Sequence, residues 1–282
     1  MTGLAAEGGW PRARLDADYT AKDCVSAADF ARIIADYARL SAPAPGLPGA
    51  RTGLVYDGSG ERLDLFGTAP GERRPLFLFL HGGYWRALSR GHSAFMAPML
   101  AARGIACAVP DYTLAPAASL TEIVRQCRAA LAWLWRNADD LGIDRGRIVV
   151  GGSSAGGHLA AALAMPGWQA AMGLPAQPLA GMLPVSGLYE LAPIAASHPQ
   201  DWLHLTPEEI ATLSPLRAPP PALRGVTALA ETETPGFTRQ SAAWATATGA
   251  PLLTVPGRNH FDVILDLAQP DTALSRALLQ LF

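Results

Sequence analysis

The residues best suited to chemistry are a serine and its small neighbours in Gly152-Ser153-Ser154-Ala155-Gly156, which fit the pattern G-x-S-x-G. The β-branched run Ile148–Val150 precedes them and Leu159–Leu163 follows, which predicts a strand, a tight turn and a helix. In such a nucleophile elbow the serine backbone is strained, so its neighbours must carry almost no side chain. Ser153 would need glycines at 151 and 155, and residue 155 is alanine. Ser154 is therefore the candidate nucleophile.

The same glycine-rich turn has two other interpretations, a phosphate-binding loop and a turn that only packs. It lacks the G-K-[ST] ending of a P-loop, and no G-x-G-x-x-G fingerprint follows an early strand. Nucleotide binding is therefore disfavoured. In a nucleophile elbow, the backbone N–H of Ala155 points at the oxygen that becomes negatively charged during the reaction.

A serine hydroxyl needs a base, and the base needs a carboxylate that orients it. After a G-x-S-x-G elbow, the acid and then the histidine follow the serine along the chain. His260 is the candidate base, because it comes just after the last predicted strand, Leu252–Val255, where a loop can bring an imidazole over Ser154. The other histidines precede the serine, lie in the elbow helix or fall in an irregular segment: His81, His92, His158, His198 and His204.

The acid should follow the preceding predicted strand, Val226–Ala230. That leaves Glu231 and Glu233, and their spacing alone does not separate them. Asp262 and Asp266 come after the histidine and are expected to be surface or helix-start charges.

A second glycine loop, His81-Gly82-Gly83-Tyr84-Trp85, follows the apolar run Leu76–Leu80. Glycines allow the backbone N–H groups of Gly82, Gly83 and Tyr84 to approach a substrate oxygen closely. Together with Ala155 they are the candidate oxyanion hole. One such donor is typically worth roughly 3–4 kcal/mol of the reaction barrier.

The elements that must position these residues alternate between strands and helices, which predicts an α/β fold with a doubly wound, mostly parallel sheet. We expect one domain over residues 1–282, with a lead-in at about 10–48 that contains a helix over 26–40. Between 186 and 225 prolines interrupt the rhythm, which predicts a lid over the site. The other predicted strands are 53–56, 62–66, 105–109, 147–150 and 180–185, and the other predicted helices are 94–103, 120–139 and 273–281.

Composition excludes several partners. Half of the 282 residues are hydrophobic, 16% are charged and the net charge is −2, with no cluster of Lys and Arg. Nucleic acid and membrane are therefore unexpected partners. We expect a cytoplasmic protein with a small-molecule substrate and no cofactor or metal, and we leave room for a homodimer. Cys24, Cys107 and Cys127 show no metal-ligand spacing and are expected to be reduced thiols without a catalytic part.

The loop His81–Trp85 resembles the HGGYW signature of the arylformamidases, or kynurenine formamidases, which have the α/β-hydrolase fold and are related to the hormone-sensitive-lipase-like esterases. The segment Glu233–Ser241 is similar to the family's D-S-P-E-F-x-R-Q-S, whose first residue is the triad acid. This match selects Glu233, with glutamate in place of aspartate. The resemblance covers nearly the whole chain and includes Asp111–Pro116 (with Thr113 in place of arginine), Ser186–Leu191, Leu213–Leu216 and Asn259–Phe261.

The resemblance implies a metal-independent serine hydrolase that cleaves N-formyl arylamines, such as N-formyl-L-kynurenine, to the arylamine and formate. Such a reaction belongs to tryptophan catabolism. A formyl group is small, so specificity must come from the aryl side, where Tyr84, Trp85 and Trp202 offer flat apolar surface. Arg86 or Arg90 would suit a substrate carboxylate, unless they are solvated surface charges.

Two alternatives remain open at this point. A carboxylesterase for short-acyl or aryl esters would use the same triad and oxyanion hole, and nothing in the sequence separates amide from ester. A binding protein of this fold without activity would be expected to lack the serine, the base or the oxyanion glycines, and all of them are present.

Overall fold

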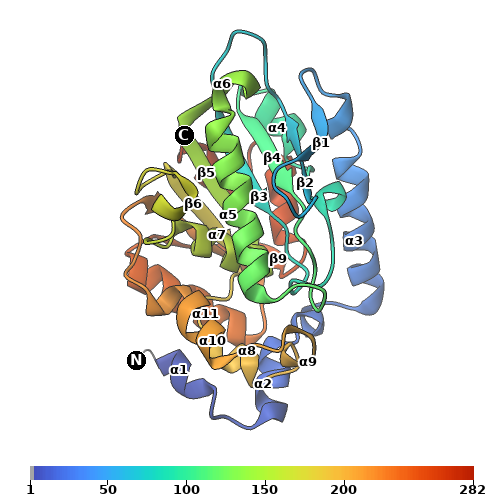
Figure 1. Ribbon diagram of the computed structural model, residues 1–282. Coiled ribbons are helices and arrows are strands. Elements are labelled where there is room, and N and C mark those ends of the chain that lie inside the picture. Colours follow the sequence, from blue (N-terminus) through green and yellow to red (C-terminus); the bar gives the residue numbers. More distant parts are fainter. Residues whose placement is uncertain (1–2) are drawn as a thin grey trace.

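One mixed sheet runs through the computed structural model, which describes residues 3–282 (Figure 1). Its strands follow the order β1-β2-β4-β3-β5-β6-β8-β9, with the short β7 paired to β6. From β4 to β9 all neighbours are parallel, and β2 is antiparallel to both β1 and β4. The strands are β1 Arg51–Val55, β2 Arg62–Phe66, β3 Arg74–Leu80, β4 Ala106–Pro110, β5 Ile143–Ser153, β6 Gly181–Val185, β7 Arg224–Gly225, β8 Thr227–Thr232 and β9 Leu252–Asn259.

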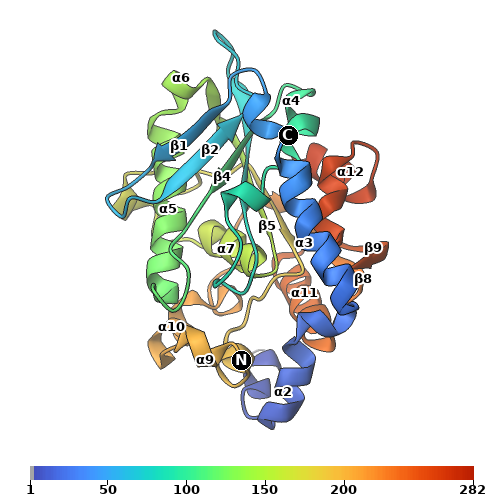
Figure 2. The same ribbon diagram turned by 90° about the vertical axis from the view of Figure 1, so that its right-hand side faces the viewer.

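Helices cover both faces of the sheet, as the alternating pattern predicts. Figure 2 shows α5 and α7 on one side and α3 and α12 on the other. The α/β fold with a mostly parallel sheet is confirmed. The helices are α1 Gly3–Glu7, α2 Arg12–Tyr19, α3 Ala27–Ser41, α4 Ala97–Ala101, α5 Leu120–Arg136, α6 Ala138–Leu141, α7 Ala155–Ala164, α8 Ala192–Ala195, α9 Gln200–Leu203, α10 Pro207–Leu213, α11 Pro235–Thr248 and α12 Ala273–Leu279.

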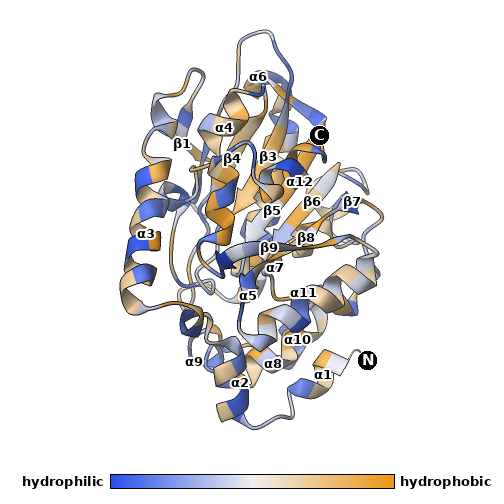
Figure 3. Cartoon of the chain, turned by 180° about the vertical axis from the view of Figure 1, so that it is seen from behind, coloured by the Kyte–Doolittle hydropathy of each residue, from blue (hydrophilic) through white to orange (hydrophobic). Residues whose placement is uncertain are grey.

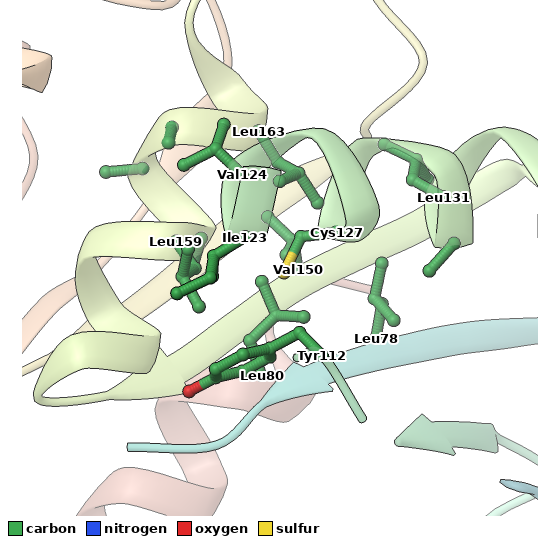
Figure 4. Close-up of a cluster of buried hydrophobic side chains, with 14 of the residues drawn as sticks. Leu78, Leu80, Tyr112, Ile123, Val124, Cys127, Leu131, Val150, Leu159 and Leu163 are labelled. Carbon is green, nitrogen blue, oxygen red and sulfur yellow. The ribbon is translucent and has the colours of Figure 1, made fainter. Parts of the chain in front are cut away.

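The central strands are apolar without alternation because each face is buried under a different helix layer. In β3, Leu76, Leu78 and Leu80 belong to the core beneath α5 and α7. Phe77 and Phe79 belong to the core beneath α3, α4 and α12. Figure 3 shows the hydrophobic colour of these strands, and Figure 4 shows α5 and α7 side chains above Leu78, Leu80 and Val150.

Several predicted helices differ at their ends. Ser26 caps α3 by accepting a hydrogen bond from the Asp29 N–H at 3.1 Å, close to the predicted start. The helix expected at 94–103 is shorter: α4 begins only at Ala97, because Pro98 is tolerated in a first turn but not in a helix interior, and it ends at Ala101. The helix expected at 120–139 divides at Asn137 into α5 and α6. The sequence patterns did not indicate α2 or α11.

The lead-in and the segment 186–225 meet at one end of the sheet, where α1, α2, α8, α9 and α10 gather (Figure 1). Arg12 forms an ion pair with Asp201 of α9 at 2.6 Å, and the Asp16 carboxylate accepts the His198 N–H at 2.6 Å. These contacts hold the two segments together across almost 190 positions of sequence. Within residues 3–282, no helix combines the length and apolar character needed to cross a membrane.

Replacing Leu78 by alanine tests the two-layer core. Leu78 is fully buried, so Leu78→Ala should lower the free energy of unfolding by about 2–5 kcal/mol. Urea titration of both proteins measures the change. Val55 is 48% exposed, so Val55→Ala is the control and should change stability by less than about 0.5 kcal/mol. Equal losses in the two variants would contradict this description of the core.

Candidate active site

The turn after β5 has the backbone geometry of a nucleophile elbow. Ser154 takes φ 58° and ψ −119°, in the region that favours glycine, while Ser153 is the last residue of β5. A Cβ at Gly152 would lie 2.3 Å from the Gly156 carbonyl oxygen, and a Cβ at Gly156 would lie 2.0 Å from the Leu80 carbonyl oxygen. Both positions must therefore be glycine, and the residue between them that leaves the strand is Ser154.

The structure brings His260 and Glu233 into direct contact. The Nδ1 of His260 donates to Oε2 of Glu233 at 2.7 Å, and the two side chains are 2% and 1% exposed. The other carboxylate oxygen, Oε1, accepts from the Ser186 hydroxyl and, at 3.4 Å, from the Ala230 N–H. No sequence pattern indicated a part for Ser186 in the site, although its φ of 46° places it in the region that favours glycine.

Glu231, the other candidate acid, is at the surface. It is exposed, and its carboxylate accepts the Gly257 N–H at 2.8 Å. Strand alternation alone would place residues 231 and 233 on the same side. Thr232 ends β8, however, so Glu233 lies in the turn before α11, where the changed backbone direction brings its carboxylate to His260.

Ser154, His260 and the glycine loop after β3 line one pocket of about 480 Å³. Ala155 does not line it, because its side chain is fully buried. As the first residue of α7, however, Ala155 has an N–H without a partner inside the helix. The structure thus gathers Ser154, His260, Gly82, Gly83 and Tyr84 around one cavity, with Glu233 behind the histidine.

The glycine loop after β3 lies directly against the backbone of the elbow. A Cβ at Gly82 would lie 2.7 Å from the Ser153 carbonyl oxygen, and one at Gly83 would lie 2.4 Å from the Ala87 carbonyl oxygen. Gly83 also has a φ of 94°. Gly82 is therefore required by the approach to the elbow and Gly83 by the tight turn toward Ala87, and both line the pocket with Ser154.

Two buried histidines near the elbow are structural. His81 stacks on Tyr112 with ring centroids 4.2 Å apart, and burial lowers the pKa of His81 to about 4. The Nε2 of His158 donates to the Leu213 carbonyl at 2.8 Å, and burial lowers the pKa of His158 to about 4 as well. Both rings are therefore neutral at pH 7.

Trp85 is a correction to the expected aromatic wall. Tyr84 and Trp202 line the pocket, but Trp85 is fully buried outside it. Its ring meets the His158 ring edge-on at 5.2 Å, in the core beneath α5 and α7. Tyr84 and Trp85 have φ angles of 51° and 58°, and this tight left-handed turn sends their side chains to different sides.

A family model for the alpha/beta hydrolase fold matches residues 77–244, which include the glycine loop, the elbow and Glu233. The chain belongs to the alpha/beta hydrolase fold family. It is therefore a hydrolase, and the relatives below confirm the resemblance to kynurenine formamidases.

The hydrolase is 30% identical to a kynurenine formamidase of Salmo salar over 80% of this chain and 79% of the relative. It is 28% identical to the kynurenine formamidase of Danio rerio over the same shares. Among solved structures, a candidate thioesterase from Silicibacter sp. TM1040 is similar with a TM-score of 0.81 and 27% identity, over 94% of this chain and 98% of the other. An esterase of Pyrobaculum calidifontis shares the fold with a TM-score of 0.74 and 19% identity, over 96% of each chain.

The lead-in also supplies a wall of the hydrolase's pocket, which the sequence patterns did not indicate. Lys22 of the lead-in, Phe30 of α3 and Phe261 after β9 line it, together with His92. No sequence pattern links these residues, because they lie far apart in the chain and come together only in the folded structure. From the segment 186–225, His198 and Trp202 reach the pocket.

The remaining predicted site residues have other partners. Arg90 forms ion pairs with Asp64 and Asp111, so its charge is already neutralised, whereas Arg86 lines the pocket. Cys24, Cys107 and Cys127 are free thiols. Across residues 3–282, no group of three or more histidine, cysteine, aspartate or glutamate side chains is arranged to hold a metal ion.

Substituting the last glycine of the elbow tests its geometry. Gly156→Ala should abolish soluble folded hydrolase or lower its melting temperature sharply, because the new methyl would overlap the Leu80 carbonyl. Gly58→Ala is the control, since a Cβ there meets nothing within 4 Å. Circular dichroism melts compare the variants. A Gly156→Ala protein as stable as the control would contradict the described elbow.

Proposed function

We propose that this hydrolase cleaves N-formyl arylamines, N-formyl-L-kynurenine or a close analogue, to the arylamine and formate through Ser154, His260 and Glu233. The observation that carries the proposal is the buried 2.7 Å contact between His260 and Glu233 beside a pocket that also contains Ser154. Similarity to kynurenine formamidases over most of the chain supports the substrate class. The reaction would place the enzyme in tryptophan catabolism.

In the first half-reaction, the Ser154 hydroxyl attacks the formyl carbon while His260 takes its proton. Glu233 accepts the hydrogen bond from Nδ1, so the proton-free Nε2 is the nitrogen that acts as base. The carboxylate then stabilises the imidazolium that forms. Ser186, which donates to the other oxygen of Glu233, holds that carboxylate in place.

Negative charge develops on the formyl oxygen as the tetrahedral intermediate forms. The N–H groups of Gly83 or Tyr84 and of Ala155 stabilise that charge. Gly82 allows the close approach of the loop. Because the left-handed Ser154 backbone and the two glycine loops are fixed before substrate binds, these donors need no rearrangement during the reaction.

His260 next protonates the amine nitrogen, the C–N bond breaks and the arylamine leaves. A water molecule gives its proton to His260 and attacks the formyl ester. The ester bond breaks, Ser154 regains its proton and formate is released. Tyr84 and Trp202, with ring centroids 6.0 Å apart, offer aromatic surface to the aryl group.

Ester hydrolysis is the second candidate function, and the apolar lining of the pocket is the observation that favours it. The pocket of about 480 Å³ extends along the side chains of Phe30, Phe79 and Phe95, which would suit the apolar part of an ester. A carboxylesterase for short-acyl or aryl esters would use the same residues.

A substrate comparison separates the two functions. kcat/KM is measured for N-formyl-L-kynurenine, formanilide and p-nitrophenyl acetate, with wild type and Ser154→Ala. We expect the formamides to be preferred, and Ser154→Ala to reduce turnover of every substrate by about 10⁴-fold or more. A clear preference for the acetate, with N-formyl-L-kynurenine untouched, would overturn the formamidase proposal and favour the esterase.

The acid is tested by two matched substitutions. Glu233→Gln should reduce kcat by about 10³–10⁴-fold, because glutamine cannot stabilise the imidazolium. Glu231→Gln should retain kcat within about threefold, since its carboxylate is exposed and bound to the Gly257 N–H. The opposite order of effects would show that the wrong acid has been chosen.

A further inference from the structure

The charges that line the active-site pocket all have one sign. Lys22 and Arg86 line it, and no aspartate or glutamate of the described residues does. A cleft lined by one sign of charge attracts ligands of the other sign. Histidines also line the pocket, but they add no negative charge.

Arg86 is the better placed of the two cations. It follows the glycine loop directly, and its backbone N–H donates to the Gly83 carbonyl at 3.0 Å. Its guanidinium lies 4.2 Å from the centre of the Trp202 ring, and the Trp202 indole N–H donates to the Tyr84 carbonyl at 3.1 Å. The contact with Trp202 holds the Arg86 guanidinium beside the aromatic surface that is proposed to bind the aryl group.

Arg86 is also free to bind an anion. Within residues 3–282, Arg90 forms ion pairs with Asp64 and Asp111, and Arg12 forms one with Asp201, whereas Arg86 forms none. A planar guanidinium held against an aromatic ring offers a carboxylate two parallel hydrogen bonds with little loss of side-chain freedom. Lys22 lies 4.6 Å from the Phe30 ring on a flexible stem and is a less organised partner.

We propose that Arg86 makes this pocket selective for aryl substrates that carry a carboxylate, and that the pocket has no counterpart for a substrate ammonium group. This inference rests on the proposed function, since it assigns the recognition of the aryl side at the same site. A zwitterionic substrate would be bound through its carboxylate, with its ammonium group left in water.

The test uses three aryl formamides that differ in charge: 4-formamidobenzoate, formanilide and 4-formamidobenzylamine. Wild-type kcat/KM should fall in the order anion, neutral, cation. Arg86→Gln should reduce kcat/KM for 4-formamidobenzoate by about tenfold, mainly through KM, and should change formanilide by less than about threefold. Arg86→Lys should restore part of the preference, because it keeps the charge but loses the planar fork.

Arg136→Gln is the matched control, since it removes one exposed positive charge at the end of α5, outside the pocket. It should leave the ratio between 4-formamidobenzoate and formanilide unchanged. An unchanged ratio in Arg86→Gln, or a loss confined to Lys22→Gln, would overturn the assignment. A cation turned over as well as the anion by wild type would overturn the charge selectivity.

The esters 4-acetoxybenzoate and phenyl acetate repeat the comparison without a formamide. If wild type cleaves the esters but no formamide, the formamidase proposal fails. The charge selectivity is then supported if Arg86→Gln reduces kcat/KM for 4-acetoxybenzoate but not for phenyl acetate, and it is overturned if both esters change equally.

Discussion

The close approach of two backbones, the end of β3 and the start of α7, is the constraint on which the site depends. Gly156 lies so near the Leu80 carbonyl that a single added methyl carbon would overlap it, at 2.0 Å. The same approach puts Gly82 against the Ser153 carbonyl. No side chains separate these two backbone segments. Ser154, with its positive φ, therefore lies beside the amides of the glycine loop that follows β3.

The parallel sheet explains why the other groups arrive at the same place. The strands β3, β5, β6, β8 and β9 run in one direction, so their carboxyl ends lie along one edge. Each end is followed by one part of the site: Gly82, Ser154, Ser186, Glu233 and His260. Loops on a rigid scaffold can thus hold polar groups of very different sequence position within hydrogen-bonding distance.

Local sequence patterns predicted those elements whose residue types strongly restrict the backbone. The apolar run before Ser154 and the glycines around it predicted both the strand and the turn. Glu233 was different: spacing left it equal to Glu231, and only the family resemblance separated them before the structure showed one carboxylate buried and the other exposed. Side-chain direction after a strand depends on the backbone of the turn, which spacing does not encode.

Three features could not be read from local pattern. The buried face of α11 includes Gln240 and Ser241, so its hydrophobic period is broken. Gln240 is buried because it binds the backbone of Tyr189 and Glu190, a contact between distant segments. Trp85 turns into the core because of two consecutive left-handed residues. Lys22 and Phe30 reach the pocket because the lead-in packs on the sheet, where Ile33 and Tyr37 of α3 join the core around Phe77 and Phe79.

Covalent labelling tests the central claim that Ser154 is the nucleophile activated by His260. The hydrolase is inactivated with diisopropyl fluorophosphate, and the modified residue is identified by peptide mass spectrometry. We expect one adduct, on Ser154, formed in step with loss of activity and much more slowly in His260→Ala. An adduct on Ser153, or complete inactivation with Ser154 unmodified, would contradict it.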